Sequence, residues 1–370
     1  MDQKLLHTPE GVRDIYNEEC ERKLTLQEQL HSVMRLYGYR DIETPTFEFF
    51  DVFSQEVGTT PSKDLYKFFD REGNTLVLRP DITPSIARAS AKYFSNEEAP
   101  IRLCYVGNTF INNTSYQGRL KETTQLGAEL IGDNSVDADA EQIAMVIESL
   151  LAAGLKEFEV SIGQVDFFKS LIQEAGIDSE MEGELKLLIS NKNNFGVEEI
   201  LSNLSIDREL KELFTSLPKL YGNREVLDMA RTMTHSDRAL ASLERLQNIY
   251  DILCIYGYER YVSFDLGMLS NYMYYTGVIF RAYTFGTGDA IVKGGRYDQL
   301  LKHFGKDAAS IGFVVVIDQL LTALNRQKIE VPVTGAPTVL RYRGEQREEV
   351  IREAKKLRSA GRNVALVREE

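Results

Sequence analysis

Residues 122–132 read ETTQLGAELIG, and this stretch decides which kind of sheet the chain builds. Side chains of an extended strand alternate between two faces, so Leu126, Ala128 and Leu130 share a face suited to a core. The opposite face carries four positions: Thr123, Gln125, Gly127 and Glu129. Taken alone, this pattern is most often a half-exposed strand with polar side chains in water. Gln125 and Glu129 on either side of a bare glycine would also offer acceptors around a space that no side chain fills.

The neighbouring segments predict more strands of the same sheet. Residues 101–111, IRLCYVGNTFI, are expected to pair antiparallel with 122–132 across a polar loop. Further strands are expected within 261–268, 277–286 and 289–295, and residues 311–324 read as a strand that runs into a helix. This order favours an α+β fold with a mostly antiparallel sheet.

The remaining patterns divide the chain. A core over residues 1–325 is expected to contain a helical insertion at about 177–250, where Leu, Glu and Lys recur at helical spacing. After a linker at 326–336, residues 337–370 predict a β-α-β unit, which we interpret as a partial α/β C-terminal domain.

Composition excludes several classes of protein. The chain has 370 residues, is 43% hydrophobic and carries a formal net charge of −13, which opposes binding to nucleic-acid phosphates. Its apolar runs are far shorter than the roughly 20 residues of a membrane helix, and no signal peptide precedes the core, so a cytoplasmic location without membrane association is expected. Cys20, Cys104 and Cys254 are widely separated, which argues against disulfides and a zinc site and predicts reduced core thiols.

Three other segments combine polar or aromatic side chains with glycines or strand ends: LRPDIT (78–83), YYTG (274–277) and GGRYD (294–298). Each is weak alone, because tyrosines are usually core residues, paired glycines usually form turns, and an aspartate at such a place is usually a helix cap. Thr83 is expected to cap the helix in which Pro84 takes the first position.

In their order along the chain, these segments resemble the catalytic core of histidyl-tRNA synthetases. The resemblance covers about residues 8–324 and rests on TPEGVRDI, YGYRDIETP, LRPDIT, GRLKETTQLGAELIG, YYTGVIF, GGRYDQL and IGFVVVIDQL. It implies a class II aminoacyl-tRNA synthetase-like antiparallel sheet flanked by helices, and a subunit interface near Pro45 that makes a homodimer. It also implies a histidine-binding site made of seven residues: Asp81, Thr83, Gln125, Glu129, Tyr274, Tyr275 and Tyr297. Asp81, Thr83 and Gln125 would contact the α-ammonium group, and Glu129, Tyr275 and Tyr297 would lie toward the imidazole.

Adenylate formation needs cations on the ATP phosphates, and the synthetases supply them as arginines in three places. The matching positions here are Ile111, Ser270 and Gln319. Residues 105–118 and 262–280 contain neither arginine nor lysine. Losing three such donors, each typically worth about 10²–10³ in rate, leaves no plausible synthetase activity.

A chain that keeps the amino-acid side and loses the nucleotide side resembles the regulatory subunits of ATP phosphoribosyltransferase, a family paralogous to the synthetases. This resemblance implies a non-catalytic subunit with histidine as its ligand. Its partner would be a separate short-form catalytic subunit, which it would subject to feedback by histidine in the first step of histidine biosynthesis. Neither a cofactor, a metal nor tRNA is expected.

Two alternatives stay open. The chain could be a histidyl-tRNA synthetase that takes its cations from Arg119, Arg281 or Arg296. It could also be a scaffold that uses the old pocket only as core, in which case it would bind no amino acid.

Overall fold

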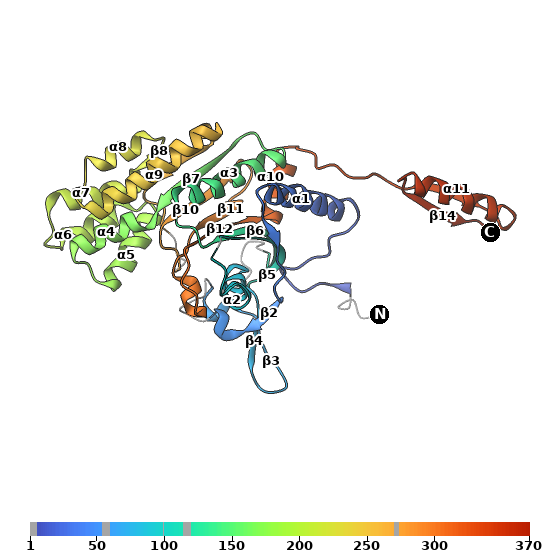
Figure 1. The fold of residues 1–370 in the computed structure, drawn as a ribbon, viewed down its shortest axis with the longest axis horizontal. Coiled ribbons are helices and arrows are strands. Elements are labelled where there is room, and N and C mark those ends of the chain that lie inside the picture. The colour runs from blue at the N-terminus through green and yellow to red at the C-terminus, as the bar shows by residue number, and fades with distance from the viewer. Residues whose placement is uncertain (1–5, 54–59, 99, 114–119, 270–273) are drawn as a thin grey trace. The chain divides into compact units, whose positions relative to one another are not determined.

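The computed structural model describes residues 6–53, 60–98, 100–113, 120–269 and 274–370. Within these residues the chain divides into two compact units, Met1–Asp14 with Leu26–Glu330 and Ile15–Thr25 with Val331–Glu370. The larger unit is built on a nine-stranded sheet (Figure 1). In spatial order its strands are β1 (Arg40–Asp41), β5 (Ile101–Phe110), β6 (Glu122–Ile131), β12 (Ser310–Val316), β11 (Val292–Arg296), β10 (Val278–Thr284), β7 (Phe158–Gln164), β9 (Val262–Asp265) and β8 (Tyr221–Gly222).

The centre of this sheet is antiparallel, which confirms the sequence prediction. Every neighbouring pair from β5 through β6, β12, β11 and β10 to β7 is antiparallel, while β1 with β5 and β7 with β9 are parallel. The register sets Glu129 opposite Gly312 and Gln125 opposite Val316. Leu126, Ala128 and Leu130 are fully buried, so the apolar face of β6 is core.

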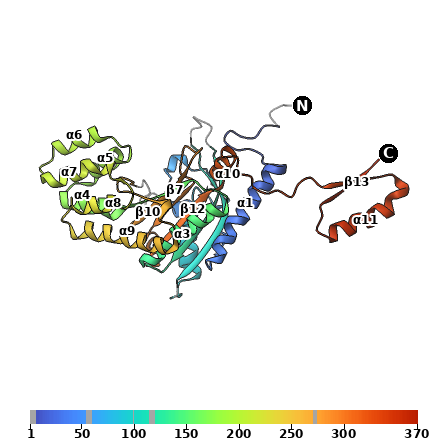
Figure 2. The ribbon, with the colours of Figure 1, turned by 90° about the horizontal axis from the view of Figure 1, so that it is seen from above.

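Helices surround the sheet. In the larger unit they are α1 (Asn17–Leu36), α2 (Thr83–Tyr93), α3 (Val136–Ala152), α4 (Val165–Ala175), α5 (Ser179–Ser190), α6 (Asn194–Ser202), α7 (Arg208–Ser216), α8 (Glu225–Arg231), α9 (Asp237–Tyr256) and α10 (Ile317–Arg326), of which α1 begins in the smaller unit. Short 3-10 helices span Phe50–Phe53, Ser62–Asp64, Leu217–Lys219, Glu259–Tyr261 and Leu300–Phe304. Helices α4–α9 gather beside β7, with α4 contacting β10 and α9 contacting β7 (Figures 1 and 2).

Local chemistry sets the ends of these helices. The side chains of Ser135 and Ser236 accept hydrogen bonds from the first turns of α3 and α9. Gly176 and Gly257 end α4 and α9 in the left-handed conformation, which costs glycine little. In the segment that we expected to be helical from about 177 to 250, Tyr221–Gly222 form the edge strand β8, and α9 continues to Tyr256.

Three further expectations differ from the structure. Thr83 is the first residue of α2 rather than its cap; Asp81 Oδ1 accepts the backbone N–H of Thr83 instead. The sequence YRDIETP (39–45) predicts a strand that ends at Pro45, but the strand is limited to β1, because the carbonyls of Thr44 and Pro45 accept hydrogen bonds from the buried Arg79 guanidinium. The sequence RYDQLLKHF (296–304) predicts a helix, but the structure has only the 3-10 turn Leu300–Phe304.

A small second sheet was not expected. It joins β2 (Phe47–Phe49), β4 (Thr75–Leu78) and β3 (Lys67–Phe69) in antiparallel pairs. Its register sets Phe49 and Phe68 on either side of Leu76, so that Phe47, Phe49 and Phe68 lie on one face. We call these three residues the phenylalanine face. They are 51%, 55% and 37% exposed, although large apolar side chains usually gain from burial.

The smaller unit contains the expected β-α-β arrangement. Strands β13 (Thr338–Tyr342) and β14 (Val364–Arg368) are parallel and are connected through a 3-10 turn at Gly344–Gln346 and helix α11 (Arg347–Ser359). The division of the chain into a core to 325, a linker at 326–336 and a unit from 337 remains our proposal. Among the described residues, no helix is both long and apolar enough to cross a membrane.

Candidate functional site

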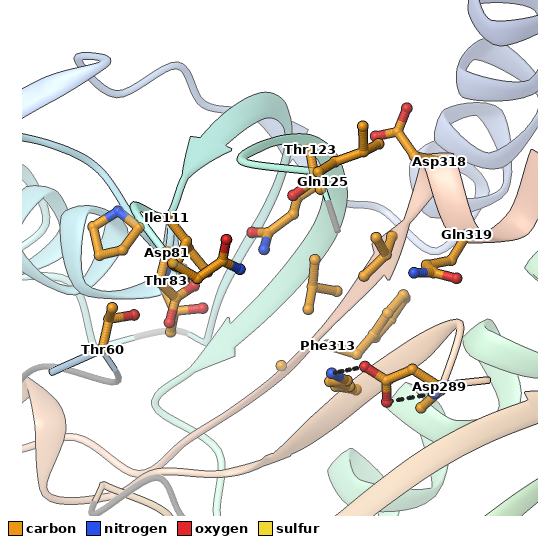
Figure 3. A pocket seen from close by; sticks show the side chains of 18 of the residues that line it. Thr60, Asp81, Thr83, Ile111, Thr123, Gln125, Asp289, Phe313, Asp318 and Gln319 are labelled. Atoms are coloured by element: carbon orange, nitrogen blue, oxygen red, sulfur yellow. Dashed lines mark hydrogen bonds and ion pairs between the residues drawn. The ribbon is translucent and has the colours of Figure 1, made fainter. Parts of the chain in front are cut away.

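A cavity of about 650 Å³ opens on the polar face of β6 and β12 (Figure 3). This volume suits a small-molecule ligand. All seven residues that the sequence indicated as a binding site line it: Asp81, Thr83, Gln125, Glu129, Tyr274, Tyr275 and Tyr297. They come from the start of α2, from β6 and from the segments on either side of β10 and β11, so the sheet brings together residues almost 220 positions apart.

Glu129 forms the floor of the cavity and is almost completely buried, with 1% of its surface exposed. Three hydroxyl groups donate to its carboxylate. Thr83 Oγ1 and the Tyr105 hydroxyl lie 2.8 and 3.3 Å from Oε1, and the Tyr297 hydroxyl lies 2.5 Å from Oε2. Because an ionised carboxylate can accept about four hydrogen bonds, a further donor from a ligand can be accommodated.

The pKa of Glu129 is raised to about 8, because burial, with a smaller contribution from the nearby charge of Asp81, outweighs the hydrogen bonds from Tyr297, Thr83 and Tyr105 that lower it. Burial and the charge of Glu129 also raise the pKa of both Tyr105 and Tyr297 well above the ordinary value, so both hydroxyls remain donors. The floor of the cavity therefore exchanges one proton close to neutral pH.

The space beside Gly127 is filled, contrary to our expectation. A Cβ on Gly127 would lie 2.5 Å from the Tyr105 hydroxyl, so the ring of Tyr105 occupies the place that we had assigned to a ligand. A Cβ on Gly312 would lie 1.6 Å from Glu129 Oε2. Gly127 on β6 and Gly312 on β12 thus make room for the side chains of Tyr105 and Glu129, and a ligand would occupy the part of the cavity that these side chains leave open.

The end of the cavity near α2 offers acceptors. Asp81 Oδ1 accepts the Thr83 N–H, and the Tyr274 hydroxyl donates to Asp81 Oδ2 at 3.3 Å. Asp81 therefore accepts the first N–H of α2 as well as lining the cavity. Gln125 Oε1 is buried and has no hydrogen-bond partner among the described residues, which is costly unless a ligand or water donates to it. Figure 3 shows Gln125 between Asp81 and Gln319.

Two of the three positions where synthetase arginines are missing also line this cavity. Ile111 lies beside Asp81, and Gln319 lies at the opposite end (Figure 3). Ser270, the third position, is outside the described residues. Ile111 and Gln319 offer no charge to a phosphate group.

Sequence reasoning missed two cations at the Gln319 end of the cavity, Lys293 and Arg326. Lys293 Nζ is ion-paired with Asp289 at 3.0 Å, and Arg326 donates to the carbonyl of Gly286. The available sequence signal for Lys293 was its position on a strand, directly before the two glycines of GGRYD.

Three arginines are alternative sources of a phosphate-binding cation, and none of those that the structure describes lines this cavity as a free cation. Arg296 is 2% exposed and its guanidinium is held by Asp139 and Asp298, so it is a structural cation. Arg281 lines a different cavity. Arg119 is outside the described residues.

Outside the cavity, one group of potential metal ligands is found among the residues that the structure describes. His31, Asp41 and Cys104 bring their ligand atoms within 4.8 Å of one another. Arg35 can only donate to His31 Nδ1, so His31 Nε2 carries the proton and donates to Asp41 Oδ1 at 2.5 Å. Burial raises the pKa of the Cys104 thiol to about 12. The group is thus satisfied by its own hydrogen bonds. Cys104 is buried as expected, whereas Cys254 is exposed.

The cavity can hold a small ligand that carries an ammonium group at the Asp81 and Gln125 end and a proton-exchanging group near Glu129. Charge-assisted hydrogen bonds to such a ligand contribute roughly 1.5–3 kcal/mol each. Phosphoryl chemistry requires cations that are free to bind the phosphate groups. At positions 111 and 319 the cavity has an isoleucine and a glutamine, which carry no charge.

Comparisons with known proteins agree that the chain is related to histidyl-tRNA synthetases and to ATP phosphoribosyltransferase regulatory subunits. The family model described as histidyl-tRNA synthetase matches residues 11–320. Two relatives are described as ATP phosphoribosyltransferase regulatory subunits. The protein from Acetivibrio thermocellus is 42% identical, over 96% of this chain and 85% of its own length, and the protein from Ruminiclostridium cellulolyticum is 41% identical, over 95% and 84%.

A solved structure from Bacillus halodurans, described as an ATP phosphoribosyltransferase regulatory subunit/histidyl-tRNA synthetase, aligns with a TM-score of 0.90 and 34% identity. The alignment covers 98% of this chain and 93% of that one. The synthetase-like fold expected from the sequence is thereby confirmed.

The buried carboxyl group of Glu129 predicts a pH-dependent stability. Below the ordinary pKa of 4.5 the group is protonated in both states; between 4.5 and about 8 it ionises only in the unfolded chain. The unfolded state therefore binds fewer protons, and the free energy of unfolding falls as pH rises through this window. Glu129→Gln should flatten this decline by a few kcal/mol at most, as measured by urea unfolding from pH 5 to 8.5.

Glu198→Gln, on the exposed face of α6, is the matched control and should leave the pH profile unchanged. A Glu129→Gln profile with the same slope as that of the unmodified protein would show that Glu129 is ionised in the folded state at neutral pH.

Proposed function

The chain belongs to the ATP phosphoribosyltransferase regulatory subunits within the histidyl-tRNA synthetase family, and from this premise we propose that it binds free histidine in the cavity above Glu129. It is a non-catalytic subunit whose role is to make a catalytic phosphoribosyltransferase chain, the enzyme of the first step of histidine biosynthesis, responsive to that amino acid. One observation carries the proposal. The seven amino-acid-site residues line one cavity, while Ile111 and Gln319 stand where a synthetase needs cations.

The α-ammonium group of histidine fits the end of the cavity near α2. An ammonium group has three hydrogens to donate. Asp81 supplies a carboxylate, and Gln125 supplies a buried carbonyl oxygen that lacks a partner among the described residues. Thr83 Oγ1 donates to Glu129 and keeps lone pairs toward the ligand. An ammonium group at this point would relieve the unsatisfied state of Gln125.

The imidazole fits the other side, toward Glu129, Tyr275 and Tyr297. Its unperturbed pKa of about 6.5 and the pKa of about 8 for Glu129 bracket neutral pH. Between these values the imidazole is neutral and the carboxyl group is protonated, so the carboxyl O–H can donate one hydrogen bond to the unprotonated ring nitrogen. Two tyrosine hydroxyls that remain protonated support the same carboxyl group.

The nucleotide end of the cavity does not support adenylate formation. Lys293 is neutralised by Asp289, and Arg326 lies on α10 with its guanidinium donating to a backbone carbonyl. A transferring phosphoryl group requires cations that are aimed at it before the reaction. The synthetase alternative is therefore the weaker one, and tRNA is not among the partners that we propose.

The partners follow from this role. The relatives are described as regulatory subunits, which implies a separate catalytic chain, and we propose that this chain is the short form of ATP phosphoribosyltransferase. We further propose that the regulatory chain forms a homodimer within the hetero-oligomer, because Phe47 and Phe49 of the phenylalanine face lie just after Pro45 and the face exposes three large apolar side chains.

Histidine binding should depend on pH in a bell-shaped manner. Affinity should be highest between about pH 6.5 and 8 and fall on both sides, where the imidazole and Glu129 carry one proton too many or too few. Asp81→Asn and Gln125→Met should each weaken binding about tenfold to a hundredfold, because each removes an acceptor for the ammonium group. Isothermal calorimetry from pH 5.5 to 9 measures both effects.

The same variants test regulation. In a complex reconstituted with the catalytic chain, the inhibition by histidine should weaken in parallel with binding, since coupling between two sites is reciprocal. Glu198→Gln is the control. Undiminished inhibition in both variants would place the regulatory site elsewhere, and a chain that binds no histidine would support the scaffold alternative.

The missing cations predict that the purified chain does not exchange pyrophosphate into ATP in the presence of histidine and does not charge tRNA. An exchange assay with a histidyl-tRNA synthetase as positive control measures this. Formation of histidyl adenylate above background would favour the synthetase alternative and contradict the regulatory role.

Dimerisation is expected to depend on the phenylalanine face. Light scattering at micromolar concentration should give the mass of a dimer, and Phe49→Glu or Phe47→Glu should weaken the dimer about tenfold to a hundredfold, since burial of one such ring contributes roughly 1.5–3 kcal/mol. Phe195→Glu provides the control, because Phe195 is 77% exposed on α6, away from this face. A monomeric unmodified protein would contradict the proposal.

A further inference from the structure

A second cavity, of about 350 Å³, lies on the same face of the sheet as the first. It is bounded by β7, β9, β10 and the turn between α5 and α6, and the residues that matter for its chemistry are Glu159, Ser161, Lys192, Asp265 and Arg281. The register shows how near the two cavities are. Arg281 on β10 is paired with Ser161 on β7 and, on its other side, with Lys293 on β11, which lines the first cavity.

We propose that this second cavity binds a small anion, a carboxylate or a phosphate group, between Arg281 and Ser161. This site is independent of the histidine site proposed above, because the two cavities share no lining residue. Its volume is near the lower limit for ligand pockets, which suits a small ligand.

The sign of the ligand follows from how the other charges are used. Lys192 Nζ contacts both carboxylate oxygens of Asp265 at 3.0 Å, and the Gly267 N–H also donates to that carboxylate. The carboxylate of Glu159 accepts hydrogen bonds from the hydroxyls of Tyr221 and Ser263. Lys192 and Asp265 therefore neutralise each other, while Glu159 is held by two neutral hydroxyls and keeps its negative charge.

Among the described residues, Arg281 is the cation of the cavity that remains without an ion-pair partner. Its guanidinium makes no hydrogen bond or ion pair within the part of the chain that the structure describes, and the residue is only partly exposed. It also stands directly opposite Lys293, and like charges at opposed positions destabilise a sheet. Asp289 forms its ion pair with Lys293, whereas the charge of Arg281 only helps to lower the pKa of Asp289 without a direct contact. An anion in the cavity would compensate this charge, and a guanidinium can bind a carboxylate or phosphate through two parallel hydrogen bonds.

Ser161 supplies the second, independent observation. The residue lines the cavity, is 3% exposed, and its Oγ has no hydrogen-bond partner among the described residues. A buried hydroxyl without a partner costs stability. An anion that binds to the guanidinium of Arg281 could also accept a hydrogen bond from this hydroxyl.

The experiment uses the full chain and two probes, sodium phosphate and sodium acetate, at matched ionic strength against sodium chloride. Either probe should raise the melting temperature in a saturable manner, and an apparent affinity follows from its concentration dependence. Arg281→Met should weaken that affinity about tenfold to a hundredfold and Ser161→Ala about threefold to tenfold. A larger response to phosphate identifies a phosphorylated ligand, and a larger response to acetate identifies a carboxylate.

Three further variants and comparisons make the result decisive. Ser161→Ala should not lower the melting temperature in sodium chloride, because the hydroxyl has no partner to lose; this separates a ligand contact from a structural role. Arg208→Met, at a position 89% exposed on α7, removes one positive charge without touching the cavity and should respond like the unmodified protein. Asp81→Asn should also keep the response, even if histidine binding is lost.

The proposal is overturned if neither probe stabilises the protein beyond sodium chloride. It is equally overturned if the stabilisation is the same in Arg281→Met and Ser161→Ala as in the unmodified chain.

Discussion

The hydrogen bonds from three hydroxyl groups to the carboxylate of Glu129 join α2 to the central strands of the larger unit beside the cavity. Thr83 at the start of α2, Tyr105 on β5 and Tyr297 after β11 converge on one side chain of β6. A buried carboxyl group without these donors would cost several kcal/mol, so α2 and the sheet strands must meet in this one arrangement. The geometry of the cavity is thus part of the core, and it needs Gly312 opposite Glu129 because any side chain there would displace the carboxylate.

The charges of the chain are divided between structure and binding. Asp139 is completely buried and pairs with both Arg296 and Arg245, which connects α3 to β11 and α9. Breaking such a buried pair typically costs about 3–5 kcal/mol, because one charge is left without compensation. Arg296 is therefore committed to the fold. The cavity keeps acidic and neutral acceptors at one end and neutralised cations at the other, which is the division expected of a site that binds an amino acid without activating it.

The sequence predicted the fold and the seven cavity residues wherever a local pattern or a motif reports on them. The alternation of residues 122–132 follows from strand geometry and was correct, as was the antiparallel pairing with 101–110. The role of Tyr105 could not be predicted, because the ring fills the space beside Gly127 only once β5 and β6 pair. Thr83 was assigned to the wrong role because a threonine before a proline suits a cap, but a buried carboxylate competes for its hydroxyl. That Lys293 and Arg281 stand opposite each other depends on sheet register, which residue spacing does not report.

In the proposed histidine site, a carboxyl group with a pKa of about 8 also determines which ligand side chains the cavity can tolerate. An apolar side chain of similar size would leave the remaining acceptor position of Glu129 empty in a dry environment, and sites built on such hydrogen bonds can reject ligands without the matching group by about 10⁴-fold. A side chain with a permanent positive charge would require Glu129 to ionise fully within a shell of neutral hydroxyls. An amphoteric ring that either donates or accepts a proton suffers neither cost. Selectivity among amino acids would then rest on proton affinity as much as on shape.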